Sequence, residues 1–329
     1  MIQAKTSHLL GTDDLQFGFK SKTSSSHAIY VLKSTIDHFN KRGSKVFVAF
    51  LDCSKAFDRL SHHGLFSKLI ERKVPLCILM CLVYWYCNMT CHVKWGSHIS
   101  RSFAIPLGVK QGGINSPDYF SCSIDDLIKT LRKCKIGCAI YKLYLAVILF
   151  ADDICLLAPT RSALQRLIES SASFCEVYGL TFNPSKSKIL VFSRKKVDFA
   201  QLKPILLNGF AVDYVTSTLY LGVEIESDRG LRFPASKDLR TFYRAANSIL
   251  TALHKPSEEV LIKLLYTNCV PIITYACHVK QFSAHDMRNC NTAINDAIRR
   301  IFTFNRWESV RSLRESFGMK SLYDSLQSF

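Results

Sequence analysis

The sequence lacks the signals of export and of membrane insertion. Residues 1–14 are polar and contain no signal-peptide core. The longest apolar stretch, Ile78–Cys87, is too short to cross a bilayer, so we expect it to form a core helix. Repeats and low-complexity linkers are also absent. We therefore expect a protein that is not secreted, has no membrane partner, and works inside the cell, in the nucleus, the cytoplasm or both.

The cysteines form neither a disulfide framework nor a zinc motif. Their number is odd, 13, and no two of them have the Cys-x2-Cys spacing of common zinc sites. We expect reduced thiols that pack as small hydrophobic side chains inside apolar runs; examples are Cys77, Cys81, Cys87 and Cys122. One denser group also matches no ordinary ligand pattern, and comprises Cys269, Cys277, His278, His285 and Cys290.

Acidic residues are few relative to basic ones. The chain has 26 Asp and Glu against 43 Lys and Arg, which gives a formal net charge of +17. This excess is large for an enzyme of small metabolites and suits a polyanionic partner, of which nucleic acid is the simplest. A basic surface that serves only solubility is the alternative interpretation.

Three aspartates follow two apolar runs. The run 46–51 leads into Asp52, and the run 145–151 leads into Asp152 and Asp153. Continuous apolar runs of this length are typical of buried strands. Carboxylates at the ends of neighbouring buried strands resist ionisation unless a cation joins them, and hard divalent cations prefer oxygen ligands. The pattern therefore indicates a two-metal site for nucleotidyl transfer, although acidic residues at strand ends also occur in plain turns.

Hydrophobic periodicity predicts a β-rich first part and a helical last part, an α+β chain. We expect helices over residues 25–40, around 65–70, over 74–90, from Ser116 to about 133, and from the cap Thr160 to Gly179. Strands are expected at 46–51, 188–193 and 218–226. Hairpins are expected at 91–106, with Gly96-Ser97 at the turn, and at 143–158, with the acids at the tip.

Six short motifs occur in a fixed order along the chain. They are QFGFK at 16–20, FLDCSKAFD at 50–58, GVKQGG at 108–113 followed by Ser116-Pro117, FADD at 150–153, NPSKSK at 183–188 and LYLG at 219–222. Together they resemble the reverse transcriptase domain of non-LTR (LINE-type) retrotransposons, in particular the jockey and CR1 groups. The resemblance implies a right-hand polymerase fold with partial fingers at 1–45, a palm with an antiparallel sheet at 46–230, inserted fingers elements at about 70–110, and a helical thumb at 231–329.

The resemblance also implies roles for individual residues. Asp52 and Asp152 would bind two Mg²⁺ ions, with Mn²⁺ as an alternative ion, Asp153 would support them, and the backbone carbonyl of Cys53 would add a ligand. For Asp58 we prefer the role of an acid at a helix N-terminus.

Further roles follow for the substrates. Lys20 would neutralise the triphosphate, Gln111 and Gly112 would line the nucleotide pocket, and Lys186 or Lys188 would protonate the leaving pyrophosphate. A tight glycine loop and solvated lysines are the alternatives. The primer grip would consist of Tyr220, Leu221 and Gly222, which a plain β-hairpin also explains. Basic helices after residue 230 would hold the duplex backbone by charge.

Phe57 indicates which sugar the site accepts. By resemblance it would lie under the sugar of the incoming nucleotide, where an apolar ring clashes with a 2′-hydroxyl and offers it no hydrogen bond. Both the resemblance and the sterics favour deoxynucleotides, and a plain core position for Phe57 is the alternative.

The predicted function is an RNA-directed DNA polymerase that takes an RNA template, a DNA primer and deoxynucleoside triphosphates. The chain starts just before the fingers motif, so we expect an N-terminally truncated copy, and Asn115 and Asp118 depart from the apolar residues usual in the second palm motif. A catalytically silent nucleic-acid-binding remnant is the alternative, and Phe57 argues against an RNA-directed RNA polymerase. The oligomeric state is left open.

Overall fold

The structure is a computed structural model that describes residues 6, 8–252, 256–319 and 322. The chain folds into two compact units, each with its own hydrophobic core. The N-terminal unit contains the residues up to Thr216 together with Ser227–Gly230. The C-terminal unit contains Ser217–Glu226 and the residues from Leu231 onward.

The N-terminal unit is built on a six-stranded sheet of order β11-β12-β10-β1-β9-β8. Neighbouring strands are antiparallel, except that β10 and β12 are parallel. The predicted strands at 46–51 and 188–193 and the hairpin at 143–158 are confirmed, whereas the prediction misses β11 and β12. The bounds are β1 Val46–Leu51, β8 Val147–Phe150, β9 Asp153–Ala158, β10 Lys188–Phe192, β11 Ile205–Leu207 and β12 Phe210–Tyr214.

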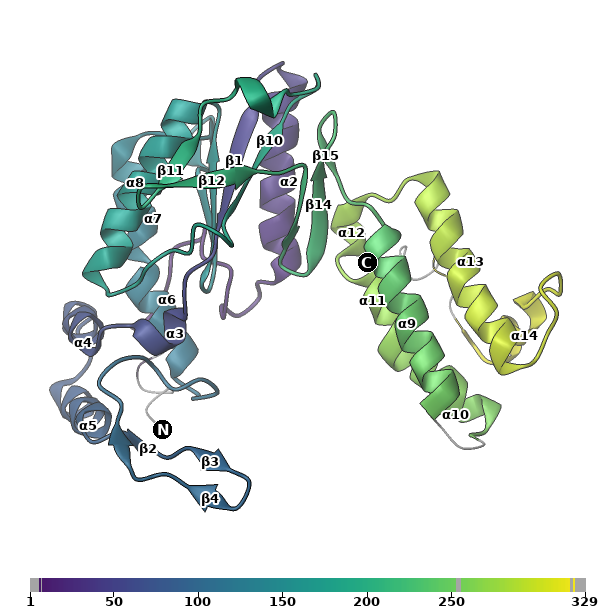
Figure 1. Ribbon diagram of the computed structural model, residues 1–329, viewed down its shortest axis with the longest axis horizontal. Helices are drawn as coiled ribbons and strands as arrows, with labels where there is room; N and C mark the ends of the chain where they lie inside the picture. The colour runs from purple at the N-terminus through teal and green to yellow at the C-terminus, as the bar shows by residue number, and fades with distance from the viewer. Residues whose placement is uncertain (1–5, 7, 253–255, 320–321, 323–329) are drawn as a thin grey trace. The chain divides into compact units, whose positions relative to one another are not determined.

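Strand β1 is apolar throughout because both of its faces are covered. Successive side chains of a strand point to opposite faces. Ala49 and Leu51 share a core with Leu164 of helix α8 (Arg161–Val177), while helix α2 (Ser25–Lys41) contacts β1 and β8. Figure 1 shows these helices on opposite faces of the sheet. All six residues of β1 are consequently buried.

Helices α2 and α8 begin and end where the sequence predicts. The hydroxyl of Thr160 accepts a hydrogen bond from the backbone N–H of Ala163 at 3.2 Å and caps α8. Gly43 and Gly179 follow the two helices with φ angles of +81° and +74°. Glycine adopts this left-handed conformation without strain, which stops each helix.

Helix α5 (Leu76–Cys87) is largely exposed, so the prediction of a core helix here is wrong. Only Leu79, Leu82 and Tyr86 are buried, whereas Tyr84 is 74% exposed. The helix is apolar on every side, and composition therefore cannot indicate which side is covered. Three of the thiols expected inside apolar packing are exposed for the same reason: Cys77, Cys81 and Cys87.

The region around α5 contains short helices and ribbons. Helix α4 confirms the helix expected around residues 65–70, and the hairpin with Gly96-Ser97 at its turn is also confirmed. The helix expected from Ser116 to about 133 consists of α6 and α7, which meet at Asp125. The bounds are α3 Ala56–Arg59, α4 His62–Glu71, β2 Thr90–Cys91, β3 Lys94–Trp95, β4 His98–Ile99, β5 Phe103–Ala104, α6 Ser116–Ile124, α7 Asp126–Cys134, β6 Ala139–Ile140 and β7 Leu143–Tyr144.

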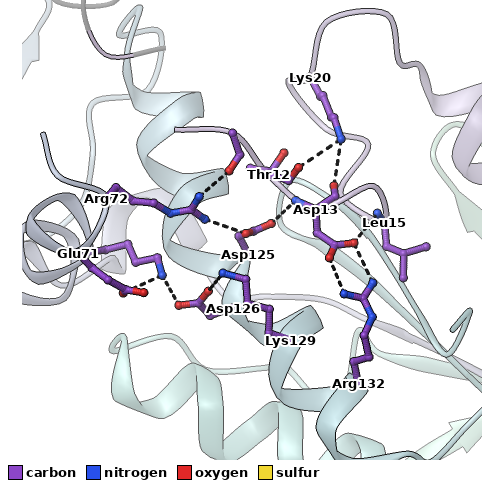
Figure 2. Close-up of polar contacts among 12 residues, drawn as sticks. Thr12, Asp13, Leu15, Lys20, Glu71, Arg72, Asp125, Asp126, Lys129 and Arg132 are labelled. Atoms are coloured by element: carbon purple, nitrogen blue, oxygen red, sulfur yellow. Dashed lines mark hydrogen bonds and ion pairs between the residues drawn. The ribbon is translucent and has the colours of Figure 1, made fainter. Parts of the chain in front are cut away.

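A network of ion pairs fixes residues 11–20 against α4 and α7 (Figure 2). The guanidinium of Arg132 donates two hydrogen bonds to the carboxylate of Asp13, at 2.7 and 3.1 Å. The carboxylate of Asp125 accepts from the backbone N–H of Asp13 at 2.6 Å and from Arg72 at 2.9 Å. Burial alone raises the pKa of Asp13, but the hydrogen bonds from Arg132 and from the N–H of Leu15 lower it overall. Asp13 thus stays ionised and anchors the chain just before residue 16.

The C-terminal unit combines a three-stranded sheet, β13-β14-β15, with helices. Its core includes Phe242, Leu265, Ile273 and Ile298. The strand expected at 218–226 is a β13–β14 hairpin, and helices follow β15, as expected. The bounds are β13 Ser217–Tyr220, β14 Val223–Ser227, β15 Leu231–Arg232, α9 Ser236–Ala252, α10 Glu258–Leu264, the π-helical turn η2 Leu265–Cys269, α11 Val270–Thr274, α12 Cys277–Lys280, α13 Ala284–Ile301 and α14 Arg311–Ser316.

One helical run in this unit, Glu258–Lys280, is long and apolar enough to cross a membrane by length and composition alone. It has 23 residues, and its most apolar window of 18 residues has a mean hydropathy of 1.5. The sequence prediction considered Ile78–Cys87 and overlooked this run. Core helices of globular proteins share these properties, and Leu261, Leu265 and Ile273 of the run are buried in the core of the unit.

Candidate active site

The three aspartates lie at one end of neighbouring strands of the central sheet, and this end is called the edge below. Strands β1 and β9 pair antiparallel with Leu51 opposite Ile154, and this register, continued by one residue, sets Asp52 opposite Asp153. Directly opposed residues of an antiparallel pair have their Cβ atoms about 5 Å apart. Asp152 belongs to the two-residue turn that joins β8 to β9. The register thus brings the acids together across about 100 residues of sequence.

Burial and mutual repulsion both act on the acids of this edge. Burial and then the charges of Asp152 and Asp52 raise the pKa of Asp153 to about 6. Burial also raises the pKa of Asp152, and the charge of Asp52 adds to it, against a hydrogen bond from the backbone of Asp152 itself. Burial and the same two charges raise the pKa of the Cys53 thiol to about 12. The edge therefore carries negative charge that the protein leaves largely uncompensated.

The donor set suits a hard divalent cation. Carboxylates and a backbone carbonyl are the ligands that Mg²⁺ takes in proteins, and a cation would relieve the repulsion that raises these pKa values. Within the part of the chain that the structure describes, no three His, Cys, Asp or Glu side chains are gathered closely enough to hold a metal as they stand. The residue types and their position at the strand ends fit a divalent cation, but the side chains would have to turn toward the ion to bind it.

The backbone of Asp52 is held by the segment that precedes β10. The N–H of Asp52 donates to the hydroxyl of Ser187 at 3.2 Å, and its carbonyl accepts from the N–H of Asn183 at 2.9 Å. The Ser187 hydroxyl also donates to the carbonyl of Asn183 at 2.7 Å, which closes the arrangement. Ser187 is fully buried. The sequence interpretation assigned no role to Ser187 or Asn183, although both lie in the NPSKSK motif.

The turn that carries Asp152 is held by the QFGFK segment. Gln16 is fully buried, and its side-chain oxygen accepts from the N–H groups of Gly18 at 3.0 Å and Ala151 at 3.3 Å. The N–H of Phe17 donates to the carbonyl of Leu149 at 2.8 Å. A Cβ atom on Gly18 would lie 2.3 Å from the nitrogen of Ala151, so only glycine allows this approach. Sequence reasoning used this motif only for Lys20 and missed Gln16 and Gly18.

Phe57 and the glycine loop lie beside each other. The ring of Phe57 stacks on that of Phe120, with centroids 4.7 Å apart and planes at 14°, and Phe19 contacts it edge-on at 6.2 Å. The carbonyl of Phe57 accepts from the N–H of Val109 at 2.7 Å. Phe57 is only partly buried, and its neighbours fix it as a rigid apolar surface.

Gln111 contacts the helix that follows Asp52. Its amide donates to the carboxylate of Asp58 at 3.4 Å, and Asp58 lies in the first turn of α3, where an acid is favourable. Gly112 has a φ of +78°, and a Cβ atom on it would meet nothing within 4 Å. A pocket of about 830 Å³, lined by residues of α5 and of this loop including Gln111, opens beside it.

The candidate lysines differ in their partners. The ammonium of Lys20 donates to the carbonyls of Thr12 at 3.3 Å and Asp13 at 3.1 Å (Figure 2), and it forms an ion pair with Asp14 at 3.2 Å. Lys188 forms an ion pair with Asp213 of β12 at 2.8 Å. Lys186 is exposed, and no ion pair of its ammonium is found in the described residues.

Tyr220, Leu221 and Gly222 belong to the C-terminal unit. They lie at the end of β13 and in the turn to β14, where Tyr220 pairs with Val223. Tyr220 is buried, whereas Leu221 and Gly222 have φ angles of +47° and +80°.

Comparison with known proteins decides the family. The family described as "Reverse transcriptase (RNA-dependent DNA polymerase)" matches residues 2–225. The chain belongs to the reverse transcriptase family. Its relatives include the Retrovirus-related Pol polyprotein from type-2 retrotransposable element R2DM of Drosophila melanogaster, 28% identical over 186 residues, which are 56% of this chain and 18% of that protein. The RNA-directed DNA polymerase from mobile element jockey of Drosophila funebris is 25% identical over 289 residues, which are 83% of this chain and 30% of that protein.

These relatives confirm the predicted resemblance to reverse transcriptases of non-LTR retrotransposons. The chain spans 17% to 45% of the length of the curated relatives it matches. Apo telomerase from Candida tropicalis superposes with a TM-score of 0.53 at 13% identity, over 97% of this chain and 53% of that one. The fold of this reverse transcriptase domain is therefore the right-hand polymerase fold, in its mixed α+β form.

Proposed function

We propose that this reverse transcriptase domain extends a DNA primer with deoxynucleotides on an RNA template. The observation that supports the proposal most directly is the register of β1 and β9, which sets Asp52 opposite Asp153 and beside the turn of Asp152. In this proposal Asp52, Asp152 and the carbonyl of Cys53 bind two Mg²⁺ ions, for which Mn²⁺ is an alternative, and Asp153 supports them. When bound, such ions make the primer 3′-hydroxyl more acidic and neutralise the reacting phosphate.

The protein's own residues position the acids and the nucleotide. Ser187 and Asn183 fix the backbone of Asp52, and Gln16 fixes the turn of Asp152. In this proposal Gln111 and Gly112 line the nucleotide pocket, and Lys20 exchanges its two carbonyl partners and the carboxylate of Asp14 for the triphosphate. We assign proton donation to the pyrophosphate to Lys186, because the ammonium of Lys188 is already paired with Asp213.

The subdomains follow the same proposal. Residues 1–45 form partial fingers, 46–230 form the palm with inserted fingers elements at about 70–110, and 231–329 form the thumb. The hairpin 217–226, which carries the proposed primer grip, belongs to the same compact unit as the residues after 230. The +17 net charge suits a template and primer partner, and we propose an intracellular location, nuclear or cytoplasmic.

Primer extension tests the proposal. Purified protein, an RNA template, a DNA primer, Mg²⁺ and deoxynucleotides should give elongated primer, and Asp152→Asn should abolish it. Asp198→Asn is the matched control, because Asp198 caps the short helix Phe199–Gln201 far along the chain and Asn keeps that cap. Folded wild-type protein that elongates no primer, at any Mg²⁺ or Mn²⁺ concentration, would refute the activity.

The catalytically silent remnant is the second candidate. It is favoured by the absence of a ready-made chelating group among the described residues. One protein preparation distinguishes the two candidates. The remnant would bind an RNA–DNA duplex in a salt-dependent manner without elongating the primer, whereas the polymerase would do both.

Phe57 tests the choice of sugar. Phe57→Val removes most of the ring that Phe120 and Phe19 hold in place, so we expect ribonucleotide incorporation to rise by about 10- to 100-fold relative to deoxynucleotides. The ratio of kcat/KM for the two nucleotides measures the effect. An unchanged ratio would return Phe57 to a plain core role, and a wild type that uses both nucleotides equally would favour an RNA-directed RNA polymerase.

A further inference from the structure

The turn between β13 and β14 has a backbone that its own sequence does not favour. Tyr220 pairs with Val223, so Leu221 and Gly222 form a two-residue turn, and both have positive φ angles, +47° and +80°. Such turns are usually made by Asn-Gly, Asp-Gly or Gly-Gly, because a branched side chain is strained in the left-handed region. Glycine suits the second position, but leucine does not suit the first. The turn therefore needs support from outside the hairpin.

That support comes from the ring of Tyr275, which directly follows α11. Its hydroxyl donates to the carbonyl of Leu221 at 3.0 Å. A Cβ atom on Gly222 would lie 3.3 Å from Cε1 of the same ring. Tyr275 thus bonds one residue of the turn, and its ring leaves little room for a side chain on the other.

The ring of Tyr275 also contacts a buried cation. The ammonium of Lys280 lies 5.9 Å from its centroid, within the range of a cation–π contact. Lys280 is 4% exposed, and its ammonium is paired with Asp238 of α9 at 2.7 Å. Figure 1 shows α12, which ends at Lys280, next to β14 within this unit. Separating a buried ammonium from its carboxylate is costly, so the pair with Asp238 fixes the direction of Lys280. The ammonium then lies over the ring of Tyr275 and helps to hold the ring in place.

Tyr275 is 42% exposed, so its ring contributes less to the core than the buried side chains around it. Its hydroxyl bonds the strained turn. We propose that Tyr275 is a positioning residue that holds the Leu221-Gly222 turn in the conformation that meets the primer 3′ end, with Lys280 and Asp238 as its support. This inference rests on the proposed function, since the primer grip is part of it.

Hydrogen–deuterium exchange on the full chain tests the contact without any catalysis. Tyr275→Phe removes only the hydroxyl that bonds Leu221, so we expect the amides of residues 217–226 to exchange about 5- to 10-fold faster, at an unchanged melting temperature. Tyr243→Phe is the matched control, because Tyr243 lies on α9 of the same unit and is 39% exposed. Equal exchange in the two variants would overturn the proposal.

Primer extension tests the consequence for the reaction. We expect Tyr275→Phe to lower kcat about 5- to 10-fold while the Kd for the primer–template duplex stays within 2-fold, and Tyr243→Phe to change neither. A loss confined to duplex affinity, or an unchanged kcat despite faster exchange, would refute positioning of the primer end. If wild-type protein extends no primer, the proposed function fails and the primer half of this inference fails with it, while the exchange result still decides the contact between Tyr275 and the turn.

Discussion

The close approach of Gly18 to the acidic turn makes a sharp prediction. An alanine at this position would place its Cβ 2.3 Å from the nitrogen of Ala151 and 2.8 Å from the carbonyl carbon of Phe150. Ordinary contact needs about 3.5 Å, so the two segments must separate by about 1 Å. That shift strains or breaks the bonds that Gln16 and Phe17 make to the turn.

The magnitude follows from these contacts. Overpacking costs about 1–3 kcal/mol, and each weakened backbone hydrogen bond adds about 1 kcal/mol. We therefore expect Gly18→Ala to lower the free energy of unfolding by about 2–4 kcal/mol. Because Asp152 belongs to the displaced turn, a misplacement of about 1 Å should also slow primer extension by about 100-fold.

Urea unfolding and single-turnover primer extension measure the two effects. Gly11→Ala is the matched control, since a Cβ at Gly11 would meet nothing within 4 Å. We expect its effect on stability to stay within about 0.5 kcal/mol and its rate to be unchanged. If Gly18→Ala is as stable and as active as Gly11→Ala, the argument that the QFGFK segment positions the acids is refuted.

Two further predictions concern charged side chains. Arg132→Met should lower the free energy of unfolding by about 1 kcal/mol at pH 7, because Asp13 loses both of its guanidinium hydrogen bonds. Burial raises the pKa of Asp13, but Arg132 helps to lower it overall. The stabilisation by Arg132 is therefore present above the unfolded pKa of about 4 and is lost as the pH falls. If wild type and variant differ in stability by the same amount at pH 7 and pH 2.5 in urea unfolding, the argument is contradicted. Lys186→Met should slow nucleotide addition by about 100-fold, while Lys188→Met, whose ammonium is already paired with Asp213, should change it less than 3-fold; the reverse order of pre-steady-state rates would assign the proton to Lys188.

The parts of the fold that local patterns specify could be predicted from the sequence. The run into Asp52 and the hairpin with Asp152 and Asp153 at its tip are both found, because burial on two faces requires an unbroken apolar strand. The ends of α8 follow from Thr160 and Gly179 for equally local reasons. Helix α5 fails because an all-apolar helix does not reveal which side is covered.

The supports of the candidate site could not be predicted from local patterns. Ser187 and Asp52 are separated by 135 positions, as are Gln16 and Ala151, and polar side chains that bond backbone atoms leave no periodic signal. Gly18 offered the best clue, since a glycine inside a motif often marks close backbone approach. The roles of the aspartates, Phe57 and the primer grip stay predictions until the reaction is measured.

The long separation between these supports has a consequence for how the protein is made. The ribosome must add residue 187 before the N–H of Asp52 finds its acceptor, and residue 151 before the side chain of Gln16 finds the turn that it supports. Contacts between residues so far apart in sequence form slowly, because the chain loses loop entropy before these contacts can offset the loss. The three carboxylates thus cannot meet before β9 is translated, about 100 residues after Asp52, and the hydroxyl that fixes the backbone of Asp52 arrives later still, with the residue that precedes β10.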